Sequence, residues 1–150
     1  MKLFFQIIFK IFLILIILAG YASTAEIKET DSDELLNQGI VLLEGFRYDR
    51  AIAYFNKAIE INPNFAEAYY NRGIAYFGKY QDDKAIADFT EAIEINPRLA
   101  DAYNNRGFAY IQKDQYDKAC SDWNRACDLG LCKDYKWAQR EGVCLKTSGH

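Results

Sequence analysis

The stretch AEAYYNRGIAYFGKYQDDKAIADFTEAIEINP, residues 66–97, decides the fold because it recurs along the chain. A close copy follows it, ADAYNNRGFAYIQKDQYDKACSDWNRACDLGL, residues 100–131. A looser copy precedes it at the same spacing, SDELLNQGIVLLEGFRYDRAIAYFNKAIEINP, residues 32–63. A fixed period of this length is typical of a solenoid, in which each unit buries its apolar face only against its neighbours. The repeat therefore predicts an extended all-α fold and favours binding over catalysis.

Four positions hold the same kind of residue in all three copies. Glycine and alanine recur where two helices have to approach closely, since a larger side chain would push the backbones apart. An aromatic recurs where we expect it to fill the gap between one hairpin and the next. These positions are Gly39, Gly73 and Gly107; Ala51, Ala85 and Ala119; Phe55, Phe89 and Trp123; and Ala58, Ala92 and Ala126.

Each copy reads as two helices joined by a short turn. Pro63 and Pro97 end the second helix, because proline has no N–H and disfavours helical geometry in the residue before it. The third copy has Leu131 at this position, so its exit is expected to differ. The pattern predicts six helices, at about residues 33–45, 49–61, 66–78, 82–95, 100–112 and 116–129.

These residues resemble the tetratricopeptide repeat (TPR) family, which adds an aromatic or large residue at the fourth position and tyrosine at the eleventh. The seventh position departs from the family's usual leucine. The resemblance implies a right-handed superhelical solenoid of three helix-turn-helix repeats, residues 32–65, 66–99 and 100–133, with a capping helix and tail over 134–150. The fourth, eleventh and seventh positions are Leu35, Tyr69 and Tyr103; Leu42, Tyr76 and Tyr110; and Gln38, Arg72 and Arg106.

The resemblance also implies a binding groove on the concave face, formed by the second, fifth, ninth and twelfth positions of each repeat. Its floor is expected to be apolar and aromatic with an acidic edge, which suits an extended or helical peptide with apolar anchors and basic flanks. We expect a protein or peptide partner, no small-molecule substrate and no cofactor. The groove positions are Asp33, Leu36, Ile40 and Leu43; Glu67, Tyr70, Ile74 and Phe77; and Asp101, Asn104, Phe108 and Ile111.

The N-terminus has the composition of a secretory signal peptide. Lys2 and Lys10 precede an apolar run at 11–20, and Ser23 and Ala25 fit a small-residue cleavage site. We expect residues 1–25 to be removed, residues 26–31 to form a polar tether, and the protein to be periplasmic or secreted. The alternative is an uncleaved anchor over residues 3–22, although it would place Lys10 inside the hydrocarbon.

The charge balance excludes one class of partner. The chain has 18 basic and 21 acidic residues, a net charge of −3. Removing residues 1–25 takes away two lysines and no acid, leaving 16 against 21 and a net charge of −5. An acidic chain of this kind has no electrostatic footprint for nucleic acid.

All four cysteines lie near the C-terminus, and an even count behind a signal peptide favours disulfides. Cys120 and Cys127 are about 10.5 Å apart along one helix, too far to pair. If residues 133–141 form a helix that turns at Gly130 and runs back antiparallel, Cys144 meets Cys120 and Cys127 meets Cys132. Reduced cysteines serving as core residues are the alternative, and His150 alone makes a metal site improbable. This tail also resembles those of small exported bacterial TPR proteins.

No residue pattern points to catalysis. Glu91 and Glu94 are read as solvated surface acids rather than an acid/base pair. The pairs Asn71–Arg72 and Asn105–Arg106 have two interpretations. They either tie helix ends and neighbouring loops together or form a polar patch that grips a peptide carboxylate.

The sequence thus predicts a non-catalytic protein-binding solenoid. Three alternatives stay open: a scaffold anchored by residues 3–22 in an envelope complex, a module whose open first-repeat face stacks on another copy, and a redox protein acting through its cysteines. The last lacks a C-x-x-C pair or a cysteine at a helix N-terminus.

Overall fold

The structure, a computed structural model, describes residue 10 and residues 31–144, and all regular structure in 31–144 is helical. Apart from Lys10, the expected signal peptide (1–25) lies outside the described residues, as do most of the tether (26–31) and the end of the tail. The helices of this part are residues 31–44, α2 Tyr48–Ile61, α3 Ala66–Gly78, α4 Asp82–Ile95, α5 Ala100–Gln112, α6 Tyr116–Asp128 and α7 Lys133–Arg140.

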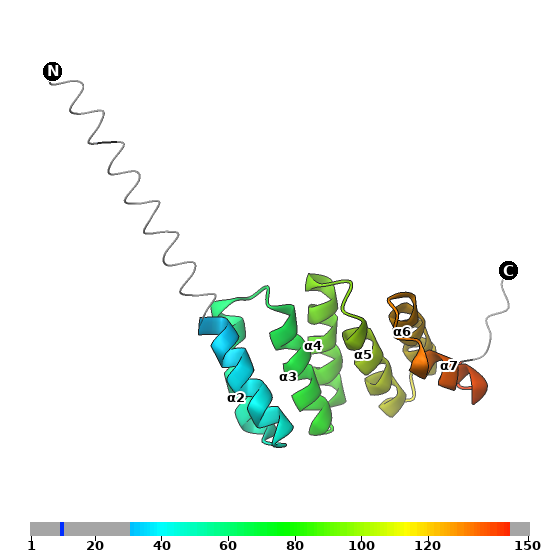
Figure 1. Cartoon of the computed structure of the whole chain (residues 1–150). Helices are drawn as coiled ribbons and strands as arrows, with labels where there is room; N and C mark the ends of the chain where they lie inside the picture. The colour runs from blue at the N-terminus through cyan, green and yellow to red at the C-terminus, as the bar shows by residue number, and fades with distance from the viewer. Residues whose placement is uncertain (1–9, 11–30, 145–150) are drawn as a thin grey trace.

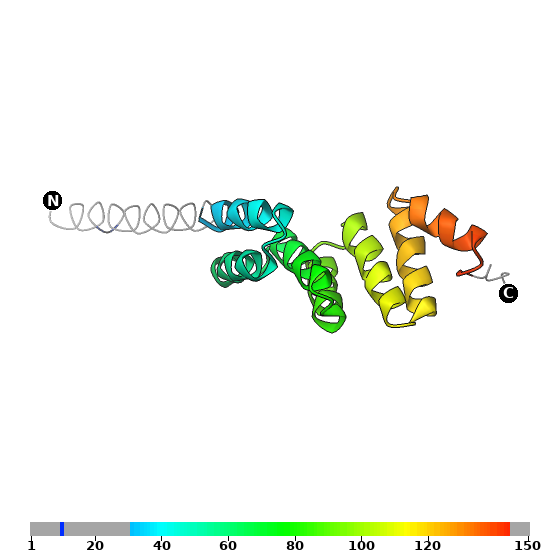
Figure 2. The ribbon, with the colours of Figure 1, turned by 90° about the horizontal axis from the view of Figure 1, so that it is seen from below.

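The helices form a row in chain order, and from α2 on each packs against the next (Figure 1). Their bounds lie within two residues of the expected ones, and the fold is an all-α solenoid of three helix-turn-helix hairpins with a capping helix. Seen from below, the hairpins are rotated relative to one another, so the row twists (Figure 2). In the described part, residue 10 and residues 31–144, no helix combines the length and apolar character needed to cross a membrane.

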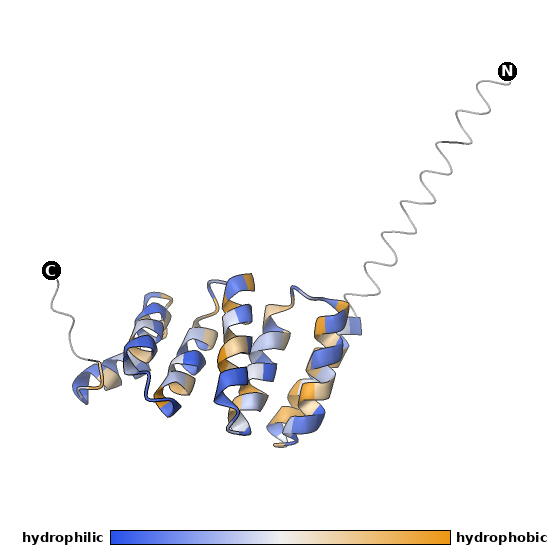
Figure 3. Ribbon diagram, turned by 180° about the vertical axis from the view of Figure 1, so that it is seen from behind, coloured by the Kyte–Doolittle hydropathy of each residue, from blue (hydrophilic) through white to orange (hydrophobic). Residues whose placement is uncertain are grey.

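Each helix is amphipathic, and Figure 3 shows hydrophobic and hydrophilic residues interleaved along the row. The helix ends follow the local sequence. Asn62 and Asn96 leave the helical conformation directly before Pro63 and Pro97, as expected for residues before proline. The third repeat has no proline there, and Gly130 ends it instead with φ of 107°, a conformation that favours glycine.

The repeated glycines are contact points within each hairpin. A Cβ added to Gly39 would lie 2.4 Å from the Phe55 ring, and one added to Gly107 would lie 2.7 Å from Nε1 of Trp123. Each buried aromatic therefore packs first against the glycine of its own hairpin. Filling the gap to the next hairpin, the expected role, is only part of what the aromatic does: Phe55 also belongs to a buried cluster that includes Ala75 of the second hairpin.

The capping helix α7 covers the open end of the third repeat. Ala138 is fully buried and forms a cluster with Trp123 and Cys144. The Cα atoms of Cys120 and Cys144 are 5.5 Å apart across one disulfide, and a second disulfide joins Cys127 to Cys132 across the turn. This arrangement corresponds to the antiparallel cap expected from the sequence.

Candidate functional site

The expected groove residues lie on the first helices of the three repeats, residues 31–44, α3 and α5. We call this surface the A-helix face. Helices α3 and α5 contact each other, and Nδ2 of Asn105 donates a hydrogen bond to the Tyr70 hydroxyl at 3.0 Å. The second and third repeats therefore present these residues side by side, as the period of the sequence predicts.

The A-helix face has an acidic edge. Asp33, Glu67 and Asp101 occupy the same position in the three repeats, and all three are exposed. Their spacing places one carboxylate on each hairpin. A row of exposed carboxylates attracts a cationic ligand and repels an anionic one.

The apolar residues of the face are half-buried and divide into two groups. Members of the first group also pack against buried clusters inside the hairpins, so they support the fold as well as the surface. Ile74 and Phe77 are not among the residues packed against these clusters in the described part of the chain. They are therefore the apolar residues of this face whose replacement should disturb these clusters least. The first group is Leu36, Ile40, Leu43, Tyr70, Phe108 and Ile111.

Tyr70 is bound into the interface between the second and third repeats. Burial, with a smaller contribution from the charge of Asp101, raises the pKa of Tyr70 to about 12, while the hydrogen bond from Asn105 acts in the opposite direction. Its ring lies 6.0 Å from that of Phe89, centroid to centroid. Tyr70 is therefore a neutral packing residue at neutral pH, with only part of its surface available to a partner.

Asn104 supplies a polar group at the third repeat. Its backbone carbonyl accepts a hydrogen bond from Nε1 of Trp123 at 3.1 Å. Its side-chain Oδ1 is buried and has no hydrogen-bond partner among the described residues. A buried acceptor without a partner is costly, and an atom closed off from solvent is not open to a ligand.

Sequence reasoning missed the partners of the two repeated arginines. Arg72 makes a two-pronged ion pair with Asp88, with both N···O distances 2.7 Å, and its third nitrogen donates to Asn56 of the preceding repeat. Hydrogen bonding to Asp88 raises the pKa of Arg72, and burial opposes this. The arginine thus joins the second helix of its own repeat to that of the repeat before.

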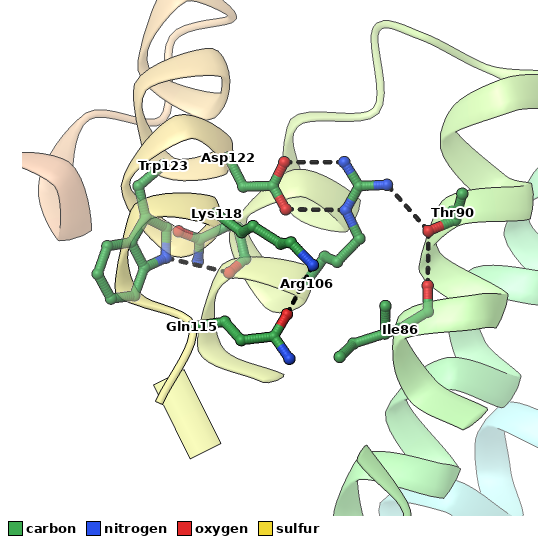
Figure 4. Close-up of polar contacts among 8 residues, drawn as sticks. Ile86, Thr90, Arg106, Gln115, Lys118, Asp122 and Trp123 are labelled. Carbon is green, nitrogen blue, oxygen red and sulfur yellow. Dashed lines mark hydrogen bonds and ion pairs between the residues drawn. The ribbon is translucent and has the colours of Figure 1, made fainter. Parts of the chain in front are cut away.

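Arg106 makes the same arrangement in the third repeat (Figure 4). It pairs with Asp122 through two 2.8 Å contacts and donates to the Thr90 hydroxyl at 2.9 Å. We call these two sets the arginine clasps. The expectation that the arginines tie helix ends to neighbouring loops is therefore wrong, because each clasp joins residues in the middles of three helices. Each clasp uses all three guanidinium nitrogens and neutralises the charge with a buried aspartate, which argues against a carboxylate-gripping patch.

A signal for the clasps was present in the sequence. An aspartate lies 16 residues after each arginine, Asp88 after Arg72 and Asp122 after Arg106. The first repeat has neither residue, because Gln38 stands at the arginine position and Tyr54 at the aspartate position. The neighbouring asparagines act differently from each other. Asn71 donates to the Glu67 carbonyl of its own helix, whereas Asn105 reaches Tyr70 in the preceding hairpin.

The part of the chain that the structure describes holds no group of three His, Cys, Asp or Glu side chains able to bind a metal ion. The cysteines there are all joined in disulfides. The groups of the A-helix face that are open to a ligand are the acidic edge and the exposed parts of Ile74 and Phe77.

Comparison with known families identifies the repeat. Models described as TPR repeat or tetratricopeptide repeat match residues 41–79, 66–99 and 89–121. The chain belongs to the tetratricopeptide repeat family. No curated protein sequence matches the chain.

Solved TPR domains have the same fold. An Arabidopsis OM64 TPR domain superposes with a TM-score of 0.72 at 23% identity, covering 77% of this chain and 96% of that one. The first TPR of Spaghetti (RPAP3), bound to the HSP90 peptide SRMEEVD, gives 0.71 at 21% identity, with coverage of 77% and 96%. The TPR2B domain of yeast Sti1, in a complex with pHsp70, gives 0.66 at 24% identity, with coverage of 75% and 90%. At these identities the similarity establishes the fold.

Proposed function

We propose that this TPR protein binds a protein segment on its A-helix face and catalyses no reaction. The observation that carries the proposal is that the first helices of the repeats carry both the exposed acids of the acidic edge and the half-buried Ile74 and Phe77. These residues combine apolar contact area with negative charge, so the favoured ligand is an apolar segment flanked by lysine or arginine. Peptides bound to TPR domains of the same fold, such as that of Spaghetti, support the general mode of binding.

The structure suggests which residues to change. Tyr70 packs against the buried cluster of Ala92, Ile93 and Ala102, so replacing it would disturb the fold along with the surface. Ile74→Ala with Phe77→Ala removes apolar contacts, and Glu67→Lys with Asp101→Lys reverses the edge. Val41 is 68% exposed on the first helix and provides the control Val41→Ala.

The test uses a fluorescent peptide with a leucine flanked by lysines, and its analogue with glutamates in place of the lysines. The lysine peptide should bind the wild type, and either double variant should weaken it by about tenfold or more. Helicity by circular dichroism and binding by the control should stay at the wild-type level. Equal binding of both peptides, or loss of helicity with loss of binding, would contradict the proposal.

We also propose that the protein works in the cell envelope after export. The basis is the composition of residues 1–25, which suits a cleaved signal peptide. Mass spectrometry of the native protein should find an N-terminus at Glu26, or at Ser23 if the earlier site is used. An intact Met1 in the membrane fraction would favour the anchored scaffold.

Stacking of copies through the first repeat is the weaker candidate. In the second and third repeats, Ala68 and Ala102 are fully buried, and Ala102 packs with Ala92 and Ile93 of the preceding hairpin. The first repeat has Glu34 at this position and exposed Val41 where the others have buried alanine. A charged side chain at a closely packed position disfavours another repeat there, as is usual for the terminal unit of a solenoid.

A further inference from the structure

The turns inside the three hairpins lie along one edge of the molecule, the lower edge in Figure 1. Each turn borders a small hollow, of about 290 Å³ at the first, 290 Å³ at the second and 370 Å³ at the third. The hollows occupy equivalent places in the repeat, so differences between them come from their side chains.

The first hollow is cationic and the others are not. Arg47, Arg50 and Lys79 line it together with Asp49, which gives a net charge of +2. Two lysines and two aspartates line the second hollow, and one lysine and two aspartates line the third, giving net charges of zero and −1. The first hollow thus differs in charge from its two counterparts at the other hairpin turns. A second cationic hollow lies on α7, where Lys133, Lys136, Gln139 and Arg140 line it without an aromatic side chain.

The arginines of the first hollow have donors to spare. Arg47 and Arg50 are exposed, and neither takes part in an ion pair within the described part of the chain. Lys79 differs, because its ammonium group pairs with Asp49. Arginine presents two parallel N–H groups that match a carboxylate, so two neighbouring arginines suit a ligand with several carboxylates.

Aromatic side chains lie beside these arginines. Phe46 is 77% exposed and meets the Tyr48 ring edge-on at 6.3 Å between centroids. Phe46 also has φ of 55°, a conformation that costs a side-chain-bearing residue roughly 1–2 kcal/mol. Tyr80 and Asp114 take the same conformation at the equivalent positions, and Tyr80 is 87% exposed, so the positive φ belongs to the turn of each repeat. What sets the first turn apart is an exposed, purely apolar ring next to two arginines, and a partner that contacts this ring would bury it.

We infer that the first hollow binds an acidic peptide segment. Its carboxylates would pair with Arg47 and Arg50, and an adjacent apolar side chain would contact Phe46 and Tyr48. This surface is distinct from the A-helix face, whose edge is acidic and favours basic segments. A lipid surface fits less well, because it would extend over the neighbouring turn, where the side chain of Asp83 is 83% exposed and would face anionic headgroups.

The experiment titrates the full chain with a fluorescent peptide that has two glutamates on either side of a leucine. Its analogue with glutamines is the charge control. Binding should saturate for the glutamate peptide alone, and backbone NMR shifts should concentrate at residues 46–50. Arg47→Glu with Arg50→Glu should weaken binding by about tenfold or more.

The matched control is Lys84→Glu with Lys118→Glu, which makes the same charge change at the position of Arg50 in the second and third repeats. It should alter binding less than twofold. Phe46→Gly should weaken binding severalfold while leaving the melting temperature unchanged or higher, because it relieves the backbone conformation. A melting temperature lowered by Phe46→Gly with binding retained would show that Phe46 serves packing and would overturn its role.

Three other results would overturn the inference. Equal weakening by both charge variants would show a long-range charge effect without a site. Shifts centred on the exposed cations of α7, Lys133, Lys136 and Arg140, would place binding at the cap. Binding to vesicles of phosphatidylcholine and phosphatidylglycerol that depends on Arg47 and Arg50, without peptide binding, would identify a lipid surface.

Discussion

At the scale of single residues, the arginine clasps decide how neighbouring repeats sit on each other. Arg106 has a side-chain exposure of 15% and Asp122 one of 8%, so water screens their pairing only weakly. The third nitrogen of the guanidinium reaches Thr90 in the preceding repeat. The clasp therefore links two hairpins through one side chain, where the family usually has leucine.

Removing one partner of a clasp should cost more than removing both. Arg106→Met leaves the Asp122 carboxylate buried without its partner and should lower the free energy of unfolding by about 2–4 kcal/mol. Arg106→Met with Asp122→Leu removes the buried charge and should recover most of this loss. Urea unfolding measures both. Gln38→Met, at the equivalent position without a clasp, should have little effect; an equal loss there would contradict the role of the clasp.

Tyr70 gives a prediction in pH. Its pKa is raised from 10.0 to about 12, so the fold favours the neutral phenol. The contribution of the neutral Tyr70 phenol to the free energy of unfolding is fully present below pH 10, and it is lost as the pH rises through 12. Tyr70→Phe should therefore lose less stability than the wild type between these values. Absorbance at 295 nm, wild type minus Tyr70→Phe, should titrate near pH 12, and a midpoint near 10 would show that Tyr70 is not buried.

At the scale of elements, α7 depends on its packing against α6 and on two disulfides. It has eight residues, and isolated helices of this length are marginal in water. Ala138 anchors it inside the cluster around Trp123, and Trp137 meets Trp123 edge-on at 6.4 Å between centroids. Disulfides on both sides of α7 restrict where it can lie.

The disulfides of the cap can be mapped directly. Non-reducing digestion of protein from its native compartment should yield Cys120 linked to Cys144 and Cys127 linked to Cys132. Cys144→Ser should free the cap and lower the free energy of unfolding by about 2–4 kcal/mol. A Cys120–Cys132 link would contradict the antiparallel cap. Four free thiols would contradict the disulfides and would mean that the cysteines serve only as core residues.

At the scale of the whole molecule, stability is shared between neighbours. The described hairpins contact one another in sequence, and the clasps and the pair of Lys113 with Asp83 at 2.8 Å join consecutive repeats. In such a chain a defect spreads mainly to the adjoining units. The middle repeat therefore has the largest influence, because it supports both others.

Overpacking the middle repeat tests this coupling. Ala85 is fully buried, and Ala85→Leu should cost about 1–3 kcal/mol. Hydrogen exchange should speed up in α3 and α4 and, to a smaller degree, in α2 and α5, with α7 affected least. An unchanged melting temperature would contradict close helix packing at this position. Uniform acceleration would indicate a single cooperative unit.

The sequence by itself determined the architecture. The regular period, the small residues at repeated positions and the prolines predicted the hairpins and their bounds to within two residues. This worked because a solenoid is built from contacts between sequence neighbours, so a local pattern carries most of the fold. The acidic edge could be read in the same way, since it depends only on position within the repeat.

Only the tertiary structure decided what the side chains touch. The sequence around Arg72 and Arg106 does not tell whether these arginines bind a ligand or pair with a buried aspartate. The answer depends on which helix lies within reach of each guanidinium group. Phe46 and Tyr80 read as turn residues, and their exposure and positive φ emerge from the path of the backbone. Such features arise from contacts across helices, which the period of a sequence does not record.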